Sequence, residues 1–342
     1  MSDDSRQEQE NARMAMLDAF YEAQLRSPAI MAKRTVAQGG KFAAGMPRKA
    51  ELKAGIPFGF RPGVSVVAQG DSWFDYLPGN DIIKALKRRG FAIKNYGTGG
   101  DTLENMLFST TYKEGSWERA PAEHEKVLES VRQIKPKFFL FSGGGNDIAG
   151  PELAPYLNHV ALKPEEPLRA DYLDFMFNQV FRQAYRYMLD SVLAAHPGVH
   201  IILHGYGHAL PTGKGVLNVG NWRFIGPWLL PSMTAKGICD PITQISVIKT
   251  MIDVFNAMLA DLAKQSSNIH YIDLRDLIKD DDWINELHLN RAGYEKVADQ
   301  YLNVMTSLMS SKEKSALAES QDFVSAFLEG DNSALEMLRQ AG

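Results

Sequence analysis

The sequence predicts an α/β protein whose parallel sheet is covered by helices on both faces. Short apolar segments alternate along the chain with longer segments of helical periodicity, which is the pattern of βαβ units. Three of the short segments run directly into Gly-rich polar turns, and ligands bind at the edge where parallel strands end. The five expected strands are residues 64–70, 91–97, 137–145, 200–207 and 268–274.

Helices are expected between these strands and after the last one. Residues 81–90 form the first, because basic side chains lie in its last turn and Gly90 is a common type of helix stop. Residues 170–195 and 241–265 form two longer helices, and another follows from Arg291. The crossovers between parallel strands are expected to be right-handed.

The two ends of the chain follow other patterns. Residues 11–25 and 311–342 carry apolar side chains at helical spacing, which predicts one N-terminal and two C-terminal amphipathic helices that pack together. Residues 27–63 are rich in Gly, Pro and Lys and predict an arm or linker. We therefore divide the chain into an N-terminal helix and arm (1–63), an α/β domain (64–310) with a candidate lid insertion (210–239), and a C-terminal helical extension (311–342).

The composition of the chain excludes some classes of binding partner and site. The formal net charge of the 342 residues is −4 and no basic stripe occurs, so no nucleic acid is expected to bind. The single cysteine, Cys239, excludes an intrachain disulfide and a cysteine-rich metal site. The acidic N-terminus lacks the features of a signal peptide, and no apolar stretch is long enough to span a bilayer. A soluble, cytoplasmic protein is expected. The sequence leaves open export by a route that needs no N-terminal signal.

Candidate catalytic residues lie where strands end. Ser72 follows the first strand in "GDSWF", either as a nucleophile or as the cap of a helix. A nucleophile needs a base, and His288 in "NELHLN" follows the last strand. The reaction also needs oxyanion donors, for which the candidates are the Ser72 N–H at the start of an expected helix, the Gly100 N–H and the Asn146 side chain. Each candidate also has a non-catalytic alternative. Gly100 and Asn146 could serve only as turn residues, and His288 could be a surface histidine.

Four blocks of sequence carry a resemblance to a known family. "GDSWF", "NYGTGGDT", "GGGND" and "NELHLN", between Gly70 and Asn290, are similar in order and spacing to the four blocks of the SGNH (GDSL-type) hydrolases. The resemblance implies a three-layer α/β/α sandwich with a flavodoxin-like five-stranded parallel sheet. It also implies hydrolysis of esters or thioesters without a cofactor. Carried over by motif, Ser72 is the nucleophile, His288 the base, and Gly100 and Asn146 complete the oxyanion hole with the Ser72 N–H.

One position departs from the family. An aspartate usually stands three residues before the histidine, whereas this chain has Asn285. An amide oxygen accepts a hydrogen bond from the imidazole Nδ1–H and holds its tautomer, but it offers the imidazolium no negative charge. We take Asn285 as the candidate, and the sequence leaves open Asp282, Glu286 or a backbone carbonyl instead.

Substrate-binding candidates lie in and before the lid segment. Trp222 and Trp228 are expected to wall an acyl site, with padding of the core as the alternative. His208 is expected at the rim of the pocket. The histidines from His196 to His208 recur every fourth residue, but four residues of strand span about 13 Å, so they predict no metal site.

These observations predict a carboxylic ester hydrolase that acts on an acyl or acetyl ester through a covalent acyl-enzyme. The expected substrate is a small-molecule, lipid or glycan ester. Two alternatives are a carbohydrate deacetylase of the same family and a catalytically weak SGNH-fold protein that serves as a binding module or scaffold. Labelling by a fluorophosphonate probe separates the hydrolases from the scaffold.

Overall fold

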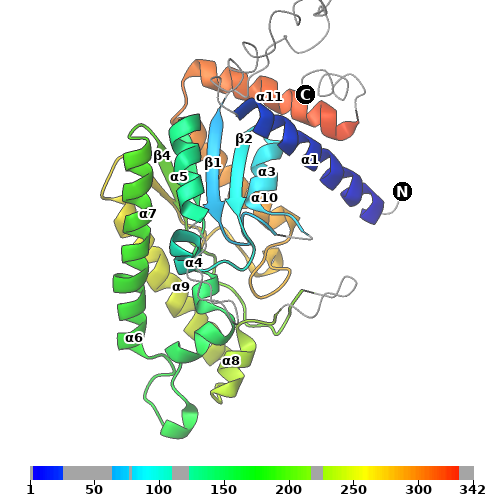
Figure 1. The fold of residues 1–342 in the computed structure, drawn as a ribbon. Coiled ribbons are helices and arrows are strands. Elements are labelled where there is room, and N and C mark those ends of the chain that lie inside the picture. Colours follow the sequence, from blue (N-terminus) through cyan, green and yellow to red (C-terminus); the bar gives the residue numbers. More distant parts are fainter. Residues whose placement is uncertain (1–2, 26–63, 77–78, 110–122, 217–225, 331–342) are drawn as a thin grey trace, which may run out of the picture.

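The computed structural model describes residues 3–25, 64–76, 79–109, 123–216 and 226–330. All five expected strands are present and form one parallel sheet in the order β2-β1-β3-β4-β5. The strands are β1 (Ser65–Gly70), β2 (Ala92–Gly97), β3 (Phe138–Phe141), β4 (His200–His204) and β5 (Ile269–Ile272). Helices cover both faces of this sheet, so the chain has the predicted three-layer α/β/α fold (Figure 1).

The helices divide between the two faces as right-handed crossovers require. The helices α5, α7 and α9 pack beside one another on one face, and α3 and α10 pack together on the other. The bounds of the larger helices are α3 (Ile82–Arg88), α4 (Leu103–Phe108), α5 (Glu123–Ile134), α6 (Ala170–Phe175), α7 (Arg182–Ala195), α8 (Leu230–Ala235), α9 (Pro241–Ala263) and α10 (Arg291–Ser307). A π-helical segment, η5 (Met176–Phe181), joins α6 to α7, so the expected helix 170–195 is continuous but not uniform. The 3-10 turns are η2 (Asn146–Ile148), η3 (Gly150–Tyr156), η4 (Val160–Leu162) and η6 (Asp280–Asp282).

The strand register brings the polar turns to one edge. Gly70, the last residue of β1, pairs with Gly97, the last residue of β2. Gln69 pairs with Phe141 at the end of β3. The turns that follow these three strands therefore begin at the same level of the sheet. Strands β3 and β4 end at Phe141 and His204, earlier than the sequence predicted. The next N–H groups, of Ser142 and Gly205, still donate to the Gln69 and Ile272 carbonyls of the neighbouring strands.

The terminal helices lie side by side at the opposite end of the sheet from α4 (Figure 1). They are α1 (Asp3–Leu25) and α11 (Ser311–Glu329), and Met14 and Leu17 of α1 are buried. Arg13 donates a hydrogen bond to the carbonyl of Leu328, so a polar contact joins the two helices. The arm and the expected second C-terminal helix lie outside the described residues. No helix within the described ranges combines the length and the apolar character that crossing a lipid bilayer requires.

Candidate active site

Ser72 lies in a single turn that follows β1. The N–H groups of Phe74 and Asp75 both donate to the Asp71 carbonyl, at 3.0 and 3.1 Å, but no helix continues from this turn. The expectation that Ser72 starts a helix is therefore wrong, and the next helix, α3, begins at Ile82 with Asp81 as its cap. The sequence accounts for the break, because Pro78 and Gly79 follow the turn and both disfavour helix.

The Ser72 hydroxyl meets His288 across the edge of the sheet. The distance between Ser72 Oγ and His288 Nε2 is 2.9 Å, although the residues are 216 positions apart. His288 lies between η6 and α10, in a loop closed by an antiparallel bridge between Trp283 and Leu289. The two sequence candidates for nucleophile and base are thus within hydrogen-bonding distance.

Asn285 contacts the other nitrogen of the same imidazole. Its Oδ1 lies 3.0 Å from His288 Nδ1 and also accepts the backbone N–H groups of Leu287 and His288, at 3.0 and 2.9 Å. Backbone N–H groups only donate, so the atom they meet is the amide oxygen and His288 Nδ1 carries the proton. His288 Nε2 therefore presents its lone pair to the Ser72 hydroxyl, which is the tautomer that a general base needs.

The two carboxylates that the sequence left open point elsewhere. Glu286 is buried and accepts hydrogen bonds from the backbone N–H groups of Gly213, Trp228, Leu229 and Leu230, at 2.5 to 3.1 Å. Asp282 pairs with Lys296 at 2.8 Å and accepts the Lys279 N–H. Asn285 is therefore the side chain that meets His288 Nδ1, while Glu286 anchors the segment that precedes α8.

Aromatic rings enclose His288. The ring of Tyr76 stacks on the imidazole with a centroid distance of 4.0 Å and an interplanar angle of 17°, and Trp228 approaches at 5.5 Å and 70°. The side chain is 4% exposed. Burial disfavours the charged form and lowers the pKa of His288 from its ordinary value of 6.5 to about 3. The imidazole is therefore neutral at neutral pH and available to accept a proton.

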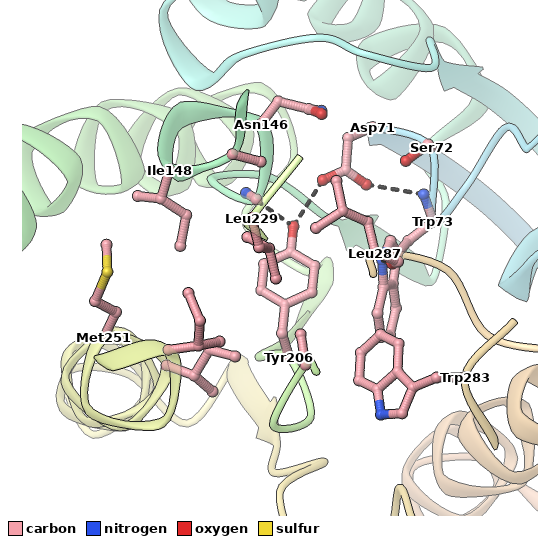
Figure 2. A pocket seen from close by; sticks show the side chains of 15 residues that line it. Asp71, Ser72, Trp73, Asn146, Ile148, Tyr206, Leu229, Met251, Trp283 and Leu287 are labelled. Atoms are coloured by element: carbon pink, nitrogen blue, oxygen red, sulfur yellow. Dashed lines mark hydrogen bonds between the residues drawn. The ribbon is translucent and has the colours of Figure 1, made fainter. Parts of the chain in front are cut away.

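Two loops bring the candidate oxyanion donors towards Ser72. A Cβ built on Gly99 would lie 3.9 Å from the Ser72 Cβ, so the turn after β2 passes beside the serine. Gly100 is exposed and has φ +87°, a conformation that favours glycine. Asn146 lines the same pocket as Ser72 (Figure 2). Its Nδ2 donates to the Asp101 carbonyl at 2.8 Å. This bond orients the amide and uses one of its two hydrogens.

Two carboxylates, Asp71 and Asp147, hold these loops together. Asp71 accepts hydrogen bonds from Trp73 N–H, Ser142 Oγ and Tyr206 Oη, at 3.0, 2.8 and 2.6 Å. Asp147 accepts the Leu103 N–H at 3.0 Å and so ties the turn after β3 to the start of α4. Burial raises the pKa of Asp147 to about 7. We assign both carboxylates a structural part in the site.

A pocket opens beside Ser72 and is mainly apolar (Figure 2). Its empty volume is about 570 Å³, and this figure includes space that is open to solvent. Polar groups lie at one end, where Ser72, Asp71 and Asn146 meet. The rest of the wall is contributed by Trp73, Gly145, Ile148, Ala149, Tyr206, Ala209, Leu229, Ile248, Met251, Ile252, Trp283 and Leu287.

The expected substrate-binding residues have different surroundings. His208 Nε2 lies 2.9 Å from Asp253 Oδ1, and Arg275 also pairs with Asp253; His208 is not among the pocket-lining residues. Trp228 contacts His288 rather than the pocket wall, and its neighbour Leu229 lines the pocket. Trp222 lies outside the described residues. Three wall residues that the sequence did not single out, Ile248, Met251 and Ile252, come from α9.

The fold and the Ser–His–Asn arrangement at the carboxyl edge of the sheet define a hydrolase of the SGNH class. Residues 62–296 match the model of the GDSL-like lipase/acylhydrolase family, and the chain belongs to this family. No curated protein matches the chain.

Solved structures whose fold is similar to that of this chain include enzymes of two kinds. An extracellular lipase from Streptomyces rimosus is 15% identical, with a TM-score of 0.44 and coverage of 72% of this chain and 100% of the lipase. A family 3 carbohydrate esterase from Clostridium thermocellum is 13% identical, with a TM-score of 0.40 and coverage of 72% and 99%. A lipase from a goat rumen metagenome is 14% identical, with a TM-score of 0.41 and coverage of 70% and 96%.

Proposed function

We propose that the protein hydrolyses carboxylic esters with an apolar acyl group, through a covalent acyl-enzyme on Ser72. The observation that carries this proposal is the continuous contact from Asn285 through His288 to Ser72 at the polar end of an apolar pocket. Membership of an acylhydrolase family supports the reaction class. The pocket wall supports the choice of acyl group.

In the first half of the proposed reaction, Ser72 Oγ attacks the carbonyl carbon of the ester. Its proton passes to His288 Nε2, which lies 2.9 Å away, and the carbonyl oxygen becomes an oxyanion. The Ser72 N–H, the Gly100 N–H and Asn146 Nδ2 are the donors proposed to stabilise that charge. The tetrahedral intermediate then breaks its bond to the alcohol oxygen, which takes the proton from His288 and leaves as the alcohol.

In the second half, a water molecule replaces the alcohol. His288 takes a proton from the water, whose oxygen attacks the carbonyl carbon of the acyl-enzyme. The bond to Ser72 Oγ then breaks, and the proton on His288 returns to the serine. The carboxylic acid leaves and the enzyme is regenerated. In both halves, Asn285 Oδ1 keeps the proton on Nδ1 and so keeps Nε2 as the exchanging atom.

The wall of the pocket favours an acyl chain over a sugar. Ile148, Leu229, Ile248, Met251 and Ile252 offer hydrocarbon surface, whereas an acetylated sugar needs polar partners for its hydroxyl groups. We therefore place the acyl group in this pocket and the alcohol on the solvent side of Ser72. An acetyl-ester or carbohydrate deacetylase remains an outcome of the test.

The test is a series of p-nitrophenyl esters from acetate to palmitate, together with labelling by a fluorophosphonate probe. We expect labelling of one serine and a value of kcat/KM that rises beyond acetate as the chain fills the pocket. A maximum at acetate, with faster release of acetate from acetylated sugars, would support the deacetylase instead. Absence of both labelling and turnover would support the scaffold.

Changes at Met251 should shift the chain-length preference. Met251→Phe adds volume at the wall and should lower kcat/KM for long esters relative to acetate, whereas Met251→Ala should extend the preference to longer chains. The measurement is the ester series for each variant. Met258→Ala is the matched control, because Met258 is equally buried on α9 but does not line the pocket. A shift of the same size in the control, or none at Met251, would contradict the assignment of this wall.

Substitutions at Asn285 test how His288 is oriented. Asn285→Asp places an anion beside Nδ1, which favours the imidazolium, so the pKa of His288 should rise. The neutral base is the active form. The acidic limb of the pH profile of kcat/KM should therefore move to higher pH, while kcat at its optimum stays equal to the wild-type value or increases. Asn285→Ala should lower kcat by about tenfold, less than the loss from a broken charged triad.

Asp282→Ala is the control for this series, since Asp282 pairs with Lys296 and should affect stability more than kcat. The measurements are kcat and its pH profile for each variant. A severe loss of kcat in Asp282→Ala, with Asn285→Ala near the wild type, would overturn the choice of Asn285.

A further inference from the structure

Tyr76 directly follows the turn that carries Ser72 and is held firmly in place. Its backbone N–H donates to Asp81 Oδ2 at 3.3 Å, and its carbonyl accepts from Lys84 Nζ at 2.9 Å. Asp81 is buried and caps α3, so these contacts attach Tyr76 to the first turn of that helix. The side chain is 8% exposed, and its position is therefore set by the fold on both its backbone and its ring.

The side chain of Tyr76 makes two contacts with the catalytic candidates. Its ring lies over the imidazole of His288, nearly parallel and with a centroid distance of 4.0 Å. Its hydroxyl oxygen accepts a hydrogen bond from Asn285 Nδ2 at 3.2 Å. Among the described residues, no carboxylate makes a hydrogen bond to His288. The charged group that the family usually places here is thus replaced by an amide and an aromatic face.

We propose that Tyr76 is a positioning residue of the hydrolase, acting through His288 and Asn285 in place of the usual carboxylate. Its ring face stabilises the imidazolium that forms as Ser72 loses its proton. Its hydroxyl holds the Asn285 amide with Oδ1 towards His288. This inference rests on the proposed function, because the imidazolium arises in that reaction.

The physical basis for the ring is its quadrupole. The face of an aromatic ring is negative and attracts a cation that lies within about 6 Å of the centroid, most strongly where water is excluded. His288 is 4% exposed, so little water screens it. This attraction stabilises the neutral imidazole of the resting enzyme only slightly, whereas it stabilises the charged imidazolium strongly. The ring therefore favours the transition state over the ground state, which raises kcat.

The hydroxyl makes the smaller contribution. The backbone N–H groups of Leu287 and His288 already hold Asn285 Oδ1, and the bond to Tyr76 adds a third restraint on the same amide. Its loss in Tyr76→Phe leaves the ring in place. We expect Tyr76→Phe to retain kcat within about threefold of the wild type, in line with the loss of one neutral hydrogen bond.

The decisive comparison is between Tyr76→Phe and Tyr76→pentafluorophenylalanine. The two side chains have nearly the same shape, but fluorination reverses the sign of the quadrupole. We expect kcat on a p-nitrophenyl ester to fall about 5- to 30-fold from the first variant to the second, with KM unchanged, as a desolvated cation–π contact implies. Labelling of Ser72 by a fluorophosphonate should slow in parallel. A purely structural ring would give equal values for both variants.

Two further variants complete the test. Tyr76→Leu keeps an apolar side chain without a quadrupole and should lose kcat relative to Tyr76→Phe. Phe91→pentafluorophenylalanine is the matched control, because Phe91 is fully buried and lies outside the pocket wall. Equal kcat in the Phe and pentafluorophenylalanine variants at position 76, or a change confined to KM, would overturn the proposed role of Tyr76. Either result would leave the proposed function standing. A wild-type protein without labelling or turnover would overturn the proposed function and this inference with it.

Discussion

Replacement of Ser72 by alanine is expected to abolish ester turnover and fluorophosphonate labelling. The hydroxyl lies 2.9 Å from His288 Nε2, and Ser72 lines the pocket, so its removal deletes the group proposed to form the acyl-enzyme. Loss of the nucleophile in a serine hydrolase costs roughly 10⁴-fold or more in kcat. The measurements are steady-state kinetics on the best ester of the series and in-gel labelling of both proteins.

Ser232→Ala is the matched control for this substitution. Ser232 also donates one hydroxyl hydrogen bond, to the Gly150 carbonyl at 2.6 Å, but it does not line the pocket. Each deletion removes one hydrogen bond, so both variants should melt near the wild-type temperature. The control should keep its activity. Retained turnover in Ser72→Ala would remove the basis of the proposed mechanism.

Replacement of Asn146 by alanine is expected to lower kcat by about 10² to 10³-fold with little change in KM. An oxyanion donor meets a charge that exists only in the transition state, and removal of one side-chain donor has this cost. The Asn146 amide is oriented by its bond to the Asp101 carbonyl, which leaves the second hydrogen for the substrate oxygen. Steady-state kinetics with a short and a long ester measure both parameters.

Asn268→Ala provides the comparison for Asn146. Asn268 Nδ2 also donates to backbone carbonyls, those of Pro197 and Val199, but it lies at the other end of the strands. This variant should keep kcat and lose some stability. A change confined to KM in Asn146→Ala would mean that the amide binds the ground state of the substrate rather than the oxyanion.

The sheet and the meeting of Ser72 with His288 were predictable because both rest on strong local patterns. Apolar segments alternating with helices define a parallel sheet, and the carboxyl ends of its strands meet at one edge. Any polar residues that follow those strands are brought together, however far apart they lie along the chain. The pair Ser72 and His288 follows from this rule, with 216 residues between them.

The sequence favours Asn285 as the partner of His288 but does not exclude Asp282 or Glu286, because the three residues lie within five residues of one another. Spacing in a loop does not determine direction. The bridge between Trp283 and Leu289 turns the loop so that Asn285 faces the imidazole and Glu286 faces the segment before α8. This bridge is a tertiary feature without a sequence signal.

Other parts of the site had misleading signals or none. The Gly-Asp-Ser sequence after a strand is typical of a helix start, but the chain makes one turn before Pro78 and Gly79. Helix α9 is apolar on several sides, and the sequence does not distinguish the side that packs on the sheet from the side that lines the pocket. Tyr76 reaches His288 only through the folded position of the turn.

The central claim, that the reaction proceeds through an acyl group on Ser72, is tested most directly by trapping that intermediate. The protein is mixed with an excess of the best p-nitrophenyl ester, quenched in acid within the first turnover, digested and analysed by peptide mass spectrometry. We predict that the mass of one acyl group is added to the peptide that contains Ser72, and that the addition is absent from Ser72→Ala. An acyl group on another residue, or turnover with no acylated peptide while the quench captures the first turnover, would contradict the account.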